Sequence, residues 1–283
     1  MNDQPVAATA PPSQSIDASV INRIDMTGDV ELQLDRIATR TAGQSQREAA
    51  KSVESILDQV RMDGDQALMA LTQQFDGFAP DPLQVPGSEL QSAWDETPAN
   101  LRDALELAHR RIQDFHQRQK PLDLDVKGVH GERLGRRWRP VQAAGLYVPG
   151  GRASYPSTVL MNAVPARAAG VERLVMVTPG GTDGTVNRTV LAAAHLAGIR
   201  EVYRIGGAQA IAALAFGTET IPKVDVISGP GNLYVTLAKK FVYGQVGIDS
   251  LAGPSEVLVI ADASADVKQV AADLLAQAEH DPL

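Results

Sequence analysis

The sequence predicts an α/β protein with a parallel sheet, and three observations support this fold class. After Pro121, short apolar runs alternate with amphipathic segments at the spacing of strand–helix–strand units. Glycine or proline follows nearly every apolar run, as a chain that turns from a strand into a helix requires. The 283 residues, 44% of them hydrophobic, suffice for a substantial core and for two domains.

The first part of the chain predicts helices. Residues 1–18 are rich in Ala, Pro, Ser and Gln without periodicity, and they predict a disordered tail. Ser45 and Glu48 match a capping box, and Gly64 is expected to interrupt the helix that follows. Residues 80–98 contain several prolines and predict a connector. Apolar residues at every third or fourth position predict three helices: 45–63, 65–75 and 99–119.

The rest of the chain predicts strands joined by helices. The predicted strands are residues 143–148, 174–178, 201–205, 224–228 and 256–261. The predicted helices are residues 157–169, 186–196, 208–216 and 233–241. In an open parallel sheet the turns at the carboxyl ends of the strands form the ligand crevice. No turn is a G-x-G-x-x-G or a phosphate-binding loop, so it is their recurrence that favours a nucleotide site.

Three polar residues beside these turns are candidates for cofactor binding. Tyr147 ends a predicted strand, while Gln209 and Asn232 stand at the first turns of predicted helices. Helix N-termini favour anionic ligands, and an aromatic ring with two amides suits a flat, polar cofactor. Helix capping by Gln209 and Asn232 and core packing by Tyr147 are the alternatives.

Further candidates lie near the end of the sequence. Ser255, just ahead of the last predicted strand, is placed either to bind substrate or to form a local turn. Gln277 and His280 are three residues apart, so they share one face of a predicted helix. Histidine is a common zinc ligand, although a solvated helix end gives the same pattern.

Composition excludes several classes of protein and site. The formal net charge of −8 argues against broad nucleic-acid binding, which needs a cationic face. The chain has no cysteine, which excludes disulfides, thiolate zinc cages and a cysteine nucleophile. Neither a secretory signal nor an apolar run of about 18 residues is visible, so we expect a soluble, cytoplasmic protein without a membrane partner.

Taken together, several segments of the chain resemble the histidinol dehydrogenase family. The resemblance runs from about residue 35 to the end, and the order and intervals of its motifs make it specific. The motifs are Gly145-Leu146-Tyr147-Val148-Pro149-Gly150-Gly151, Ser157-Thr158-Val159-Leu160-Met161, Gly206-Gly207-Ala208-Gln209-Ala210-Ile211, Gly229-Pro230-Gly231-Asn232, Ile248-Asp249, Ala252-Gly253-Pro254-Ser255-Glu256-Val257 and Gln277-Ala278-Glu279-His280.

The resemblance implies an activity, cofactors and site residues. The family oxidises L-histidinol to L-histidine through an aldehyde, with two NAD per turnover, in the last step of histidine biosynthesis. It implies that Tyr147, Gln209 and Asn232 contact NAD. Ser255, Gln277 and His280 would contact the substrate, and Gln277 and His280 would also bind zinc.

The resemblance also implies a domain organisation. The family has two incomplete Rossmann-like domains with parallel sheets, the second inserted in the first. Residues 19–120 and 255–283 would form the first domain, which is incomplete here, and residues 121–254 the second. The family is a homodimer that shares active-site residues across subunits through its C-terminal domains, which we expect to be absent from this chain.

The family's proton-transferring Glu–His pair and its remaining zinc ligands match no position in residues 1–283. We therefore expect no catalytic residue before Leu283, and a fragment that is inactive by itself. The alternative from another class is a non-catalytic nucleotide-binding α/β module or pseudoenzyme. An ordinary NADP-linked Rossmann dehydrogenase is disfavoured because G-x-G-x-x-G is absent.

Overall fold

The computed structural model describes residues 29–39, 44–150, 154–251 and 257–278. The predicted tail of residues 1–18 lies outside these ranges. The chain divides into two units, Met1–Gln46, which contains helix α1 (Val30–Thr39), and Arg47–Leu283. Among the described helices, none is both long and apolar enough to cross a membrane.

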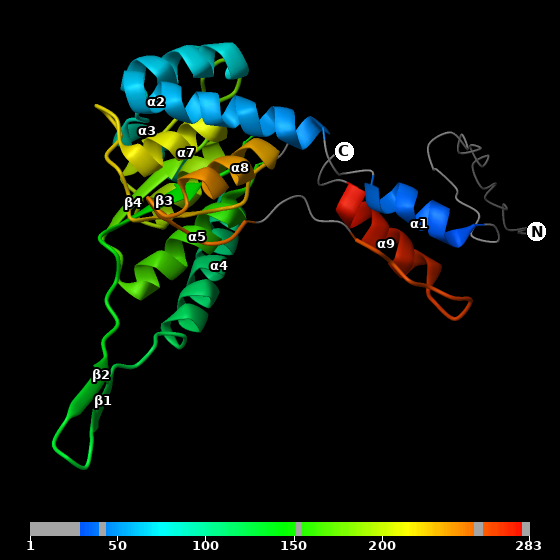
Figure 1. The fold of residues 1–283 in the computed structure, drawn as a ribbon. Helices are drawn as coiled ribbons and strands as arrows, with labels where there is room; N and C mark the ends of the chain where they lie inside the picture. The colour runs from blue at the N-terminus through cyan, green and yellow to red at the C-terminus, as the bar shows by residue number, and fades with distance from the viewer. Residues whose placement is uncertain (1–28, 40–43, 151–153, 252–256, 279–283) are drawn as a thin grey trace, which may run out of the picture. The chain divides into compact units, whose positions relative to one another are not determined.

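The second unit is built around a five-stranded parallel sheet (Figure 1). Its order is β5 (Glu201–Tyr203), β4 (Arg173–Val177), β3 (Ala143–Tyr147), β6 (Val226–Ser228) and β7 (Gly247–Ile248). The chain therefore starts in the middle at β3, moves outward to β5, and returns to add β6 and β7 on the other side. This is the strand order of a Rossmann fold, with the switch point between β3 and β6. The predicted α/β class with a Rossmann-like parallel sheet is confirmed.

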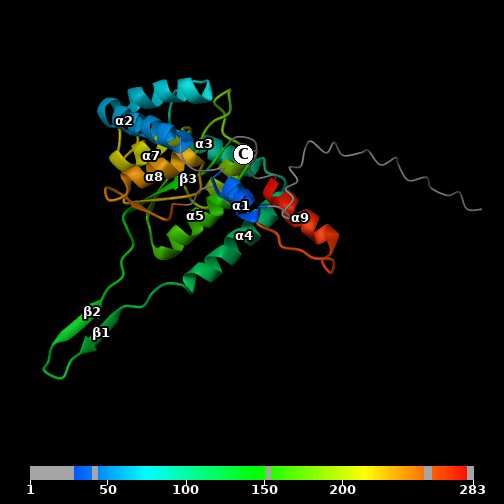
Figure 2. The same ribbon diagram turned by 45° about the vertical axis from the view of Figure 1, so that its right-hand side comes forward.

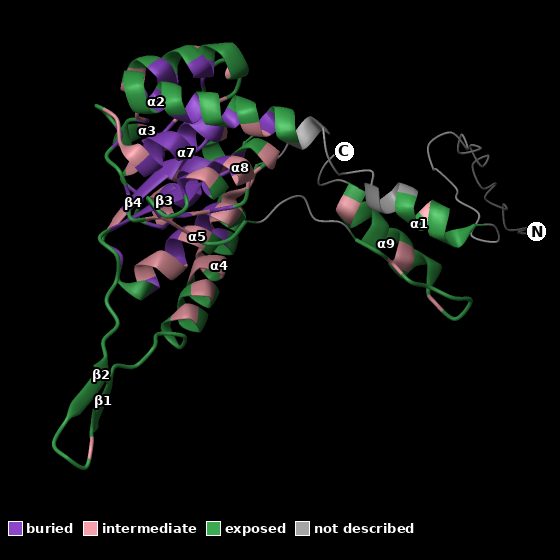
Figure 3. Ribbon diagram, viewed as in Figure 1, coloured by how far each residue is buried: buried purple, intermediate pink, exposed green. Residues whose placement is uncertain are grey.

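Helices cover both faces of the sheet because successive strand residues point to opposite sides. Leu146 and Met176 belong to the core on one face, and Tyr147 and Val177 to the core on the other. The first face is covered by α3 (Gly87–Asp95), α4 (Ala99–Gln117), α5 (Pro156–Ala169) and α6 (Arg188–Leu196). The second is covered by α2 (Gln44–Asp76), α7 (Gly207–Phe216) and α8 (Leu233–Val242). Buried residues concentrate in the sheet and in the helices that touch it (Figure 3).

Helix α2 is interrupted where the sequence predicts it. Gly64 has φ 52° and ψ −129°, a backbone conformation that favours glycine. The Glu219 carboxylate accepts a hydrogen bond of 2.8 Å from the Asp65 backbone N–H, and a Cβ at Gly64 would lie 2.2 Å from the same oxygen. The kink therefore needs glycine for its backbone, and any side chain there would also displace the Glu219 carboxylate.

The prediction of a connector over residues 80–98 is wrong, because α3 occupies Gly87–Asp95. Pro86 and Pro98 are the N-cap residues of α3 and α4. Proline is tolerated at a helix start, where its missing N–H has no intrahelical partner to lose. The prolines therefore mark two helix starts.

A hairpin precedes the sheet and was not predicted. Strands β1 (Leu124–Lys127) and β2 (Arg133–Arg136) pair in antiparallel fashion, and all their residues are exposed. The hairpin extends away from the sheet in two views that differ by 45° (Figures 1 and 2).

The predicted strand at residues 256–261 is wrong for its described part. Residues 257–260 lie in no strand, and Leu258 and Ile260 are 85% and 89% exposed. An apolar run becomes a strand only when a neighbour takes up its backbone hydrogen bonds. Helix α9 (Val267–Ala278) follows and buries no residue. The assignment of residues 255–283 and 19–120 to a first domain stays a prediction.

Candidate functional site

A cleft of about 880 Å³ opens at the carboxyl ends of the central strands. One wall comes from α2, and the other from residues that directly follow β3, β4, β5 and β6. Tyr147, Gln209 and Asn232 all line it. The three residues that the sequence singles out for a cofactor therefore lie at one crevice, next to the switch point of the sheet.

The chain packs closely at the carboxyl ends of the strands beside the cleft. Gly229, directly after β6, has φ +125°, and a Cβ there would lie 2.1 Å from the carbonyl oxygen of Tyr147. A Cβ at Gly150 or at Gly206 would each lie 2.7 Å from the ring of Pro179. The turns after β3, β4 and β5 are thus in contact, the turn after β6 packs on the end of β3, and glycine at these positions permits the approach.

Tyr147 is both a core residue and part of the cleft. Its ring belongs to the core beneath α7 and α8, and its hydroxyl accepts a hydrogen bond of 3.1 Å from the Gly207 backbone N–H. Burial raises the pKa of Tyr147 to about 12, and the nearby Asp76 carboxylate adds to the rise, while the Gly207 hydrogen bond opposes it. Tyr147 therefore stays protonated at neutral pH and fixes the start of α7.

Gln209 and Asn232 differ in how their side chains are used. Asn232 is the N-cap of α8, and its oxygen accepts from the Val235 backbone N–H at 3.1 Å, so the capping alternative holds for this residue. Asn232 also lines the cleft. Gln209, by contrast, is 2% exposed and lines the cleft from the first turn of α7.

Two charged side chains from α2 complete the lining. Lys51 and Asp76 are the only cation and the only carboxylate among the described residues that line the cleft. Asp76 is the last residue of α2, and one of its oxygens, Oδ2, is buried without a partner among the described residues. Burial raises the pKa of Asp76. The cleft therefore combines a cation, a poorly solvated carboxylate and the positive ends of α7 and α8.

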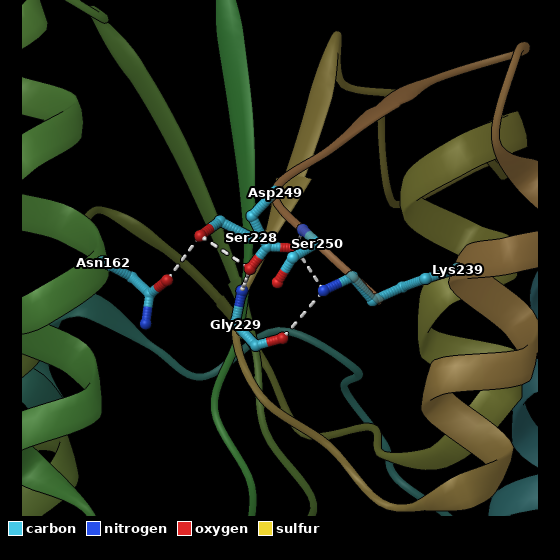
Figure 4. Close-up of polar contacts among 6 residues, drawn as sticks. All are labelled: Asn162, Ser228, Gly229, Lys239, Asp249 and Ser250. Carbon is cyan, nitrogen blue, oxygen red and sulfur yellow. Dashed lines mark hydrogen bonds and ion pairs between the residues drawn. The ribbon is translucent and has the colours of Figure 1, made fainter. Parts of the chain in front are cut away.

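A polar network supports the turn that carries Asn232 (Figure 4). Lys239 of α8, which is 2% exposed, donates to the Gly229 carbonyl at 3.1 Å and forms an ion pair with Asp249. Asp249 also accepts from the Gly229 backbone N–H at 2.9 Å. Ser228 donates to Asn162 of α5 at 2.5 Å. The turn after β6 is thus fixed by side chains from α5, α8 and the end of β7.

The charge on Asp249 depends on this network. Burial opposes its ionisation, but hydrogen bonds from Lys239 and from the backbone N–H groups of Gly229 and Ser250 outweigh burial and lower its pKa. Because Lys239 is almost fully buried, its ammonium group needs this carboxylate nearby. The pair therefore stabilises the turn only while both groups are ionised.

The remaining predicted residues are not brought to the cleft by described contacts. Ser255 and His280 lie outside the described residues. Gln277 is a partly buried residue of α9 and is absent from the cleft lining. Within the described ranges no group of three or more His, Asp or Glu residues is placed to hold a metal.

Sequence reasoning missed the charged residues of the site, although Asp76 and Lys239 each carried a signal. Asp76 is the last residue of α2, where a negative charge interacts unfavourably with the helix dipole. An acidic residue at such a position indicates a role other than stabilising the helix. Lys239 shares the apolar face of α8 with Val235 and Val242, which predicts a buried lysine. Asp249 was noted only as part of a motif.

Known proteins of one family match most of this chain. The sequence model of the family described as histidinol dehydrogenase matches residues 39–283. The chain belongs to this family. A histidinol dehydrogenase from Prochlorococcus marinus (strain MIT 9313) is 75% identical over 251 residues, which cover 89% of this chain and 57% of that protein. One from Parasynechococcus marenigrum (strain WH8102) is 69% identical over 253 residues, covering 89% and 58%.

A solved structure shows the same fold. The crystal structure of histidinol dehydrogenase from Elizabethkingia anophelis matches with a TM-score of 0.76 and 41% identity, over 85% of this chain and 55% of that one. The chain thus spans less than two thirds of the length of these histidinol dehydrogenases.

Proposed function

We propose that this chain forms the NAD-binding part of a histidinol dehydrogenase, the enzyme that oxidises L-histidinol to L-histidine through the aldehyde. The single observation that carries the proposal is the cleft at the switch point of the sheet, lined together by Tyr147, Gln209 and Asn232. In open α/β sheets this is where dinucleotides bind. Zinc, a homodimer and a cytoplasmic location belong to the proposal on family grounds.

The residues of the cleft fit a dinucleotide. Its volume, about 880 Å³, lies in the range of cofactor pockets. Asp76 Oδ2 is buried without a partner among the described residues, and a ligand with hydroxyl groups would supply one. Lys51 and the N-termini of α7 and α8 suit the pyrophosphate. NAD would supply the hydride acceptor.

The protein groups bind and orient the cofactor. Gly207 donates to Tyr147, and this bond fixes the start of α7, from which Gln209 faces the cleft. The network around Asp249 fixes the turn that presents Asn232. For zinc, Gln277 and His280 would be two of the ligands, and the others match no position in residues 1–283. For the chain tested alone we therefore expect NAD binding without turnover.

Calorimetric titration of the purified chain with NAD tests the proposal. In Gln209→Leu, which keeps the side-chain volume, the loss of one ligand hydrogen bond should weaken NAD binding about 10-fold. Gln113→Leu, at an exposed position of α4, is the matched control and should bind as the wild type does. A wild-type chain that folds but does not bind NAD would contradict the assignment of the cleft.

A second measurement addresses the chemistry. With L-histidinol, zinc and NAD present, the absorbance of NADH should not rise for the chain alone. NADH formation that scales with the concentration of the chain, and disappears in His280→Ala, would show that residues 1–283 already contain the proton-transfer groups.

A further inference from the structure

The carboxylate that lines the cleft, Asp76, comes from helix α2 and not from a turn that follows a strand. In Rossmann folds an acidic residue that follows the first unit hydrogen-bonds the ribose hydroxyls of NAD. In this sheet the second strand along the chain is β4, and the residues that follow it, Thr178, Pro179 and Gly180, include no acid. The next acid, Asp183, has its Oδ1 occupied by the N–H and hydroxyl of Thr185.

Asp76 reaches the same edge of the sheet from the opposite wall. Two residues after Asp76, the ring of Phe78 packs on the loop that follows β4, since a Cβ at Gly180 would lie 2.8 Å from its Cζ. Phe78 likewise packs against Gly184, where a Cβ would lie 3.0 Å from the ring. This contact holds the end of α2 beside the turn in which a Rossmann fold carries its acid. Asp76 lines the cleft together with Gly180.

The environment of Asp76 favours a neutral ligand group that donates hydrogen bonds. No described residue donates a hydrogen bond to its carboxylate, and Oδ2 is buried. The carboxylate stands at the C-terminal end of α2, where unpaired carbonyl groups add to the negative potential. A hydroxyl would satisfy such a group, whereas a phosphate beside it would be repelled. The raised pKa of Asp76 agrees with a poorly solvated carboxylate.

We propose that Asp76 accepts hydrogen bonds from the adenosine ribose hydroxyls of the bound dinucleotide and thereby selects NAD over its 2′-phosphorylated form, NADP. The inference rests on the proposed function, because it requires a dinucleotide in this cleft. It assigns cofactor selectivity to α2, outside the strand-to-helix turns that the sequence points to. Lys51, the cation of the lining, contributes to binding of both dinucleotides.

Calorimetric titrations of the whole chain with NAD and with NADP test this. The wild type should bind NAD at least about 10-fold more tightly than NADP, as expected for one charge-assisted hydrogen bond. In Asp76→Asn the affinity for NAD should fall about 10-fold and that for NADP should not fall, so the preference disappears. Asp76→Ser, which leaves room for the phosphate, should bind NADP more tightly than the wild type does.

Controls separate selectivity from folding and from the proposed function. Asp58→Asn changes an exposed carboxylate of the same helix that does not line the cleft, and both affinities should stay as in the wild type. Asp76→Asn removes a buried, unpartnered charge, so it should melt no lower than the wild type. Suppose that the wild type binds NAD, and that both Asp76 variants keep its preference for NAD or lose affinity for NAD and NADP equally. This inference is then overturned, while the proposed function stands. If a folded wild type binds neither, the proposed function falls with it.

Discussion

Replacement of Asp249 by asparagine tests whether the Lys239–Asp249 pair holds the site together. The ammonium group of Lys239 is almost fully buried and has two described partners, the Asp249 carboxylate and the Gly229 carbonyl. The asparagine would keep the size of the side chain and remove its charge. A buried cation would then remain without a charged partner, beside neutral acceptors alone.

The structure sets the size of the expected effect. Removing one partner of a buried ion pair costs about 3–5 kcal/mol. The Asp249 side chain is 34% exposed, which admits some water, so we expect the lower end, about 3 kcal/mol. For a unit of this size each kcal/mol lowers Tm by about 2–4 °C. The Asp249→Asn variant should therefore melt roughly 6–12 °C below the wild type.

Circular dichroism melts at several pH values are the assay. Because the folded-state pKa of Asp249 is lowered from its ordinary 3.8, its contribution is present above that value and is lost as the pH falls below it. The difference between wild type and Asp249→Asn should therefore shrink below about pH 4. Asp125→Asn breaks the exposed pair with Arg133 and should change the stability by less than about 1 kcal/mol.

Two results would refute the reasoning. One is an Asp249→Asn variant that melts within about 2 °C of the wild type, on the order of the control's shift. The other is strict additivity in the double variant Lys239→Met/Asp249→Asn. Removing both charges leaves no unpaired ion. The double variant should therefore lose about 1–3 kcal/mol less unfolding free energy than the two single variants lose in sum.

Two further outcomes are expected. Gly229→Ala should lose about 3 kcal/mol of stability in urea titrations, because φ is +125° and the new Cβ would lie 2.1 Å from the Tyr147 carbonyl oxygen. Gly198→Ala, with φ +70° and open space, should lose only about 1 kcal/mol, and equal losses would contradict the steric argument. Zinc should bind weakly, because Gln277 and His280 provide two of about four ligands. A stoichiometric zinc that resists a mild chelator and is lost in His280→Ala would contradict this.

The sequence alone was sufficient for strands β3 to β6 and for the turns that line the cleft, but it did not predict β7. The strands around Tyr147 and Val177 and the helix starts at Gly207 and Leu233 follow from apolar runs bounded by glycine and proline. The break at Gly64 follows in the same way. These features depend on residues within a turn or two of each other, so local spacing encodes them. Where local patterns were ambiguous, as with the prolines around α3, the prediction failed.

Only the tertiary structure decided which charges belong to the site. Asp76 lies near Tyr147 because α2 packs on the face of the sheet that carries alternate residues of β3. Lys239 and Asp249 meet because β7 pairs with β6 beneath α8. Burial of apolar faces brings together residues that are far apart in the sequence. Because this driving force is non-directional, short sequence patterns do not show which distant residues will meet. The role of a charged side chain depends on its partners and on its exposure to water, and the tertiary packing determines both.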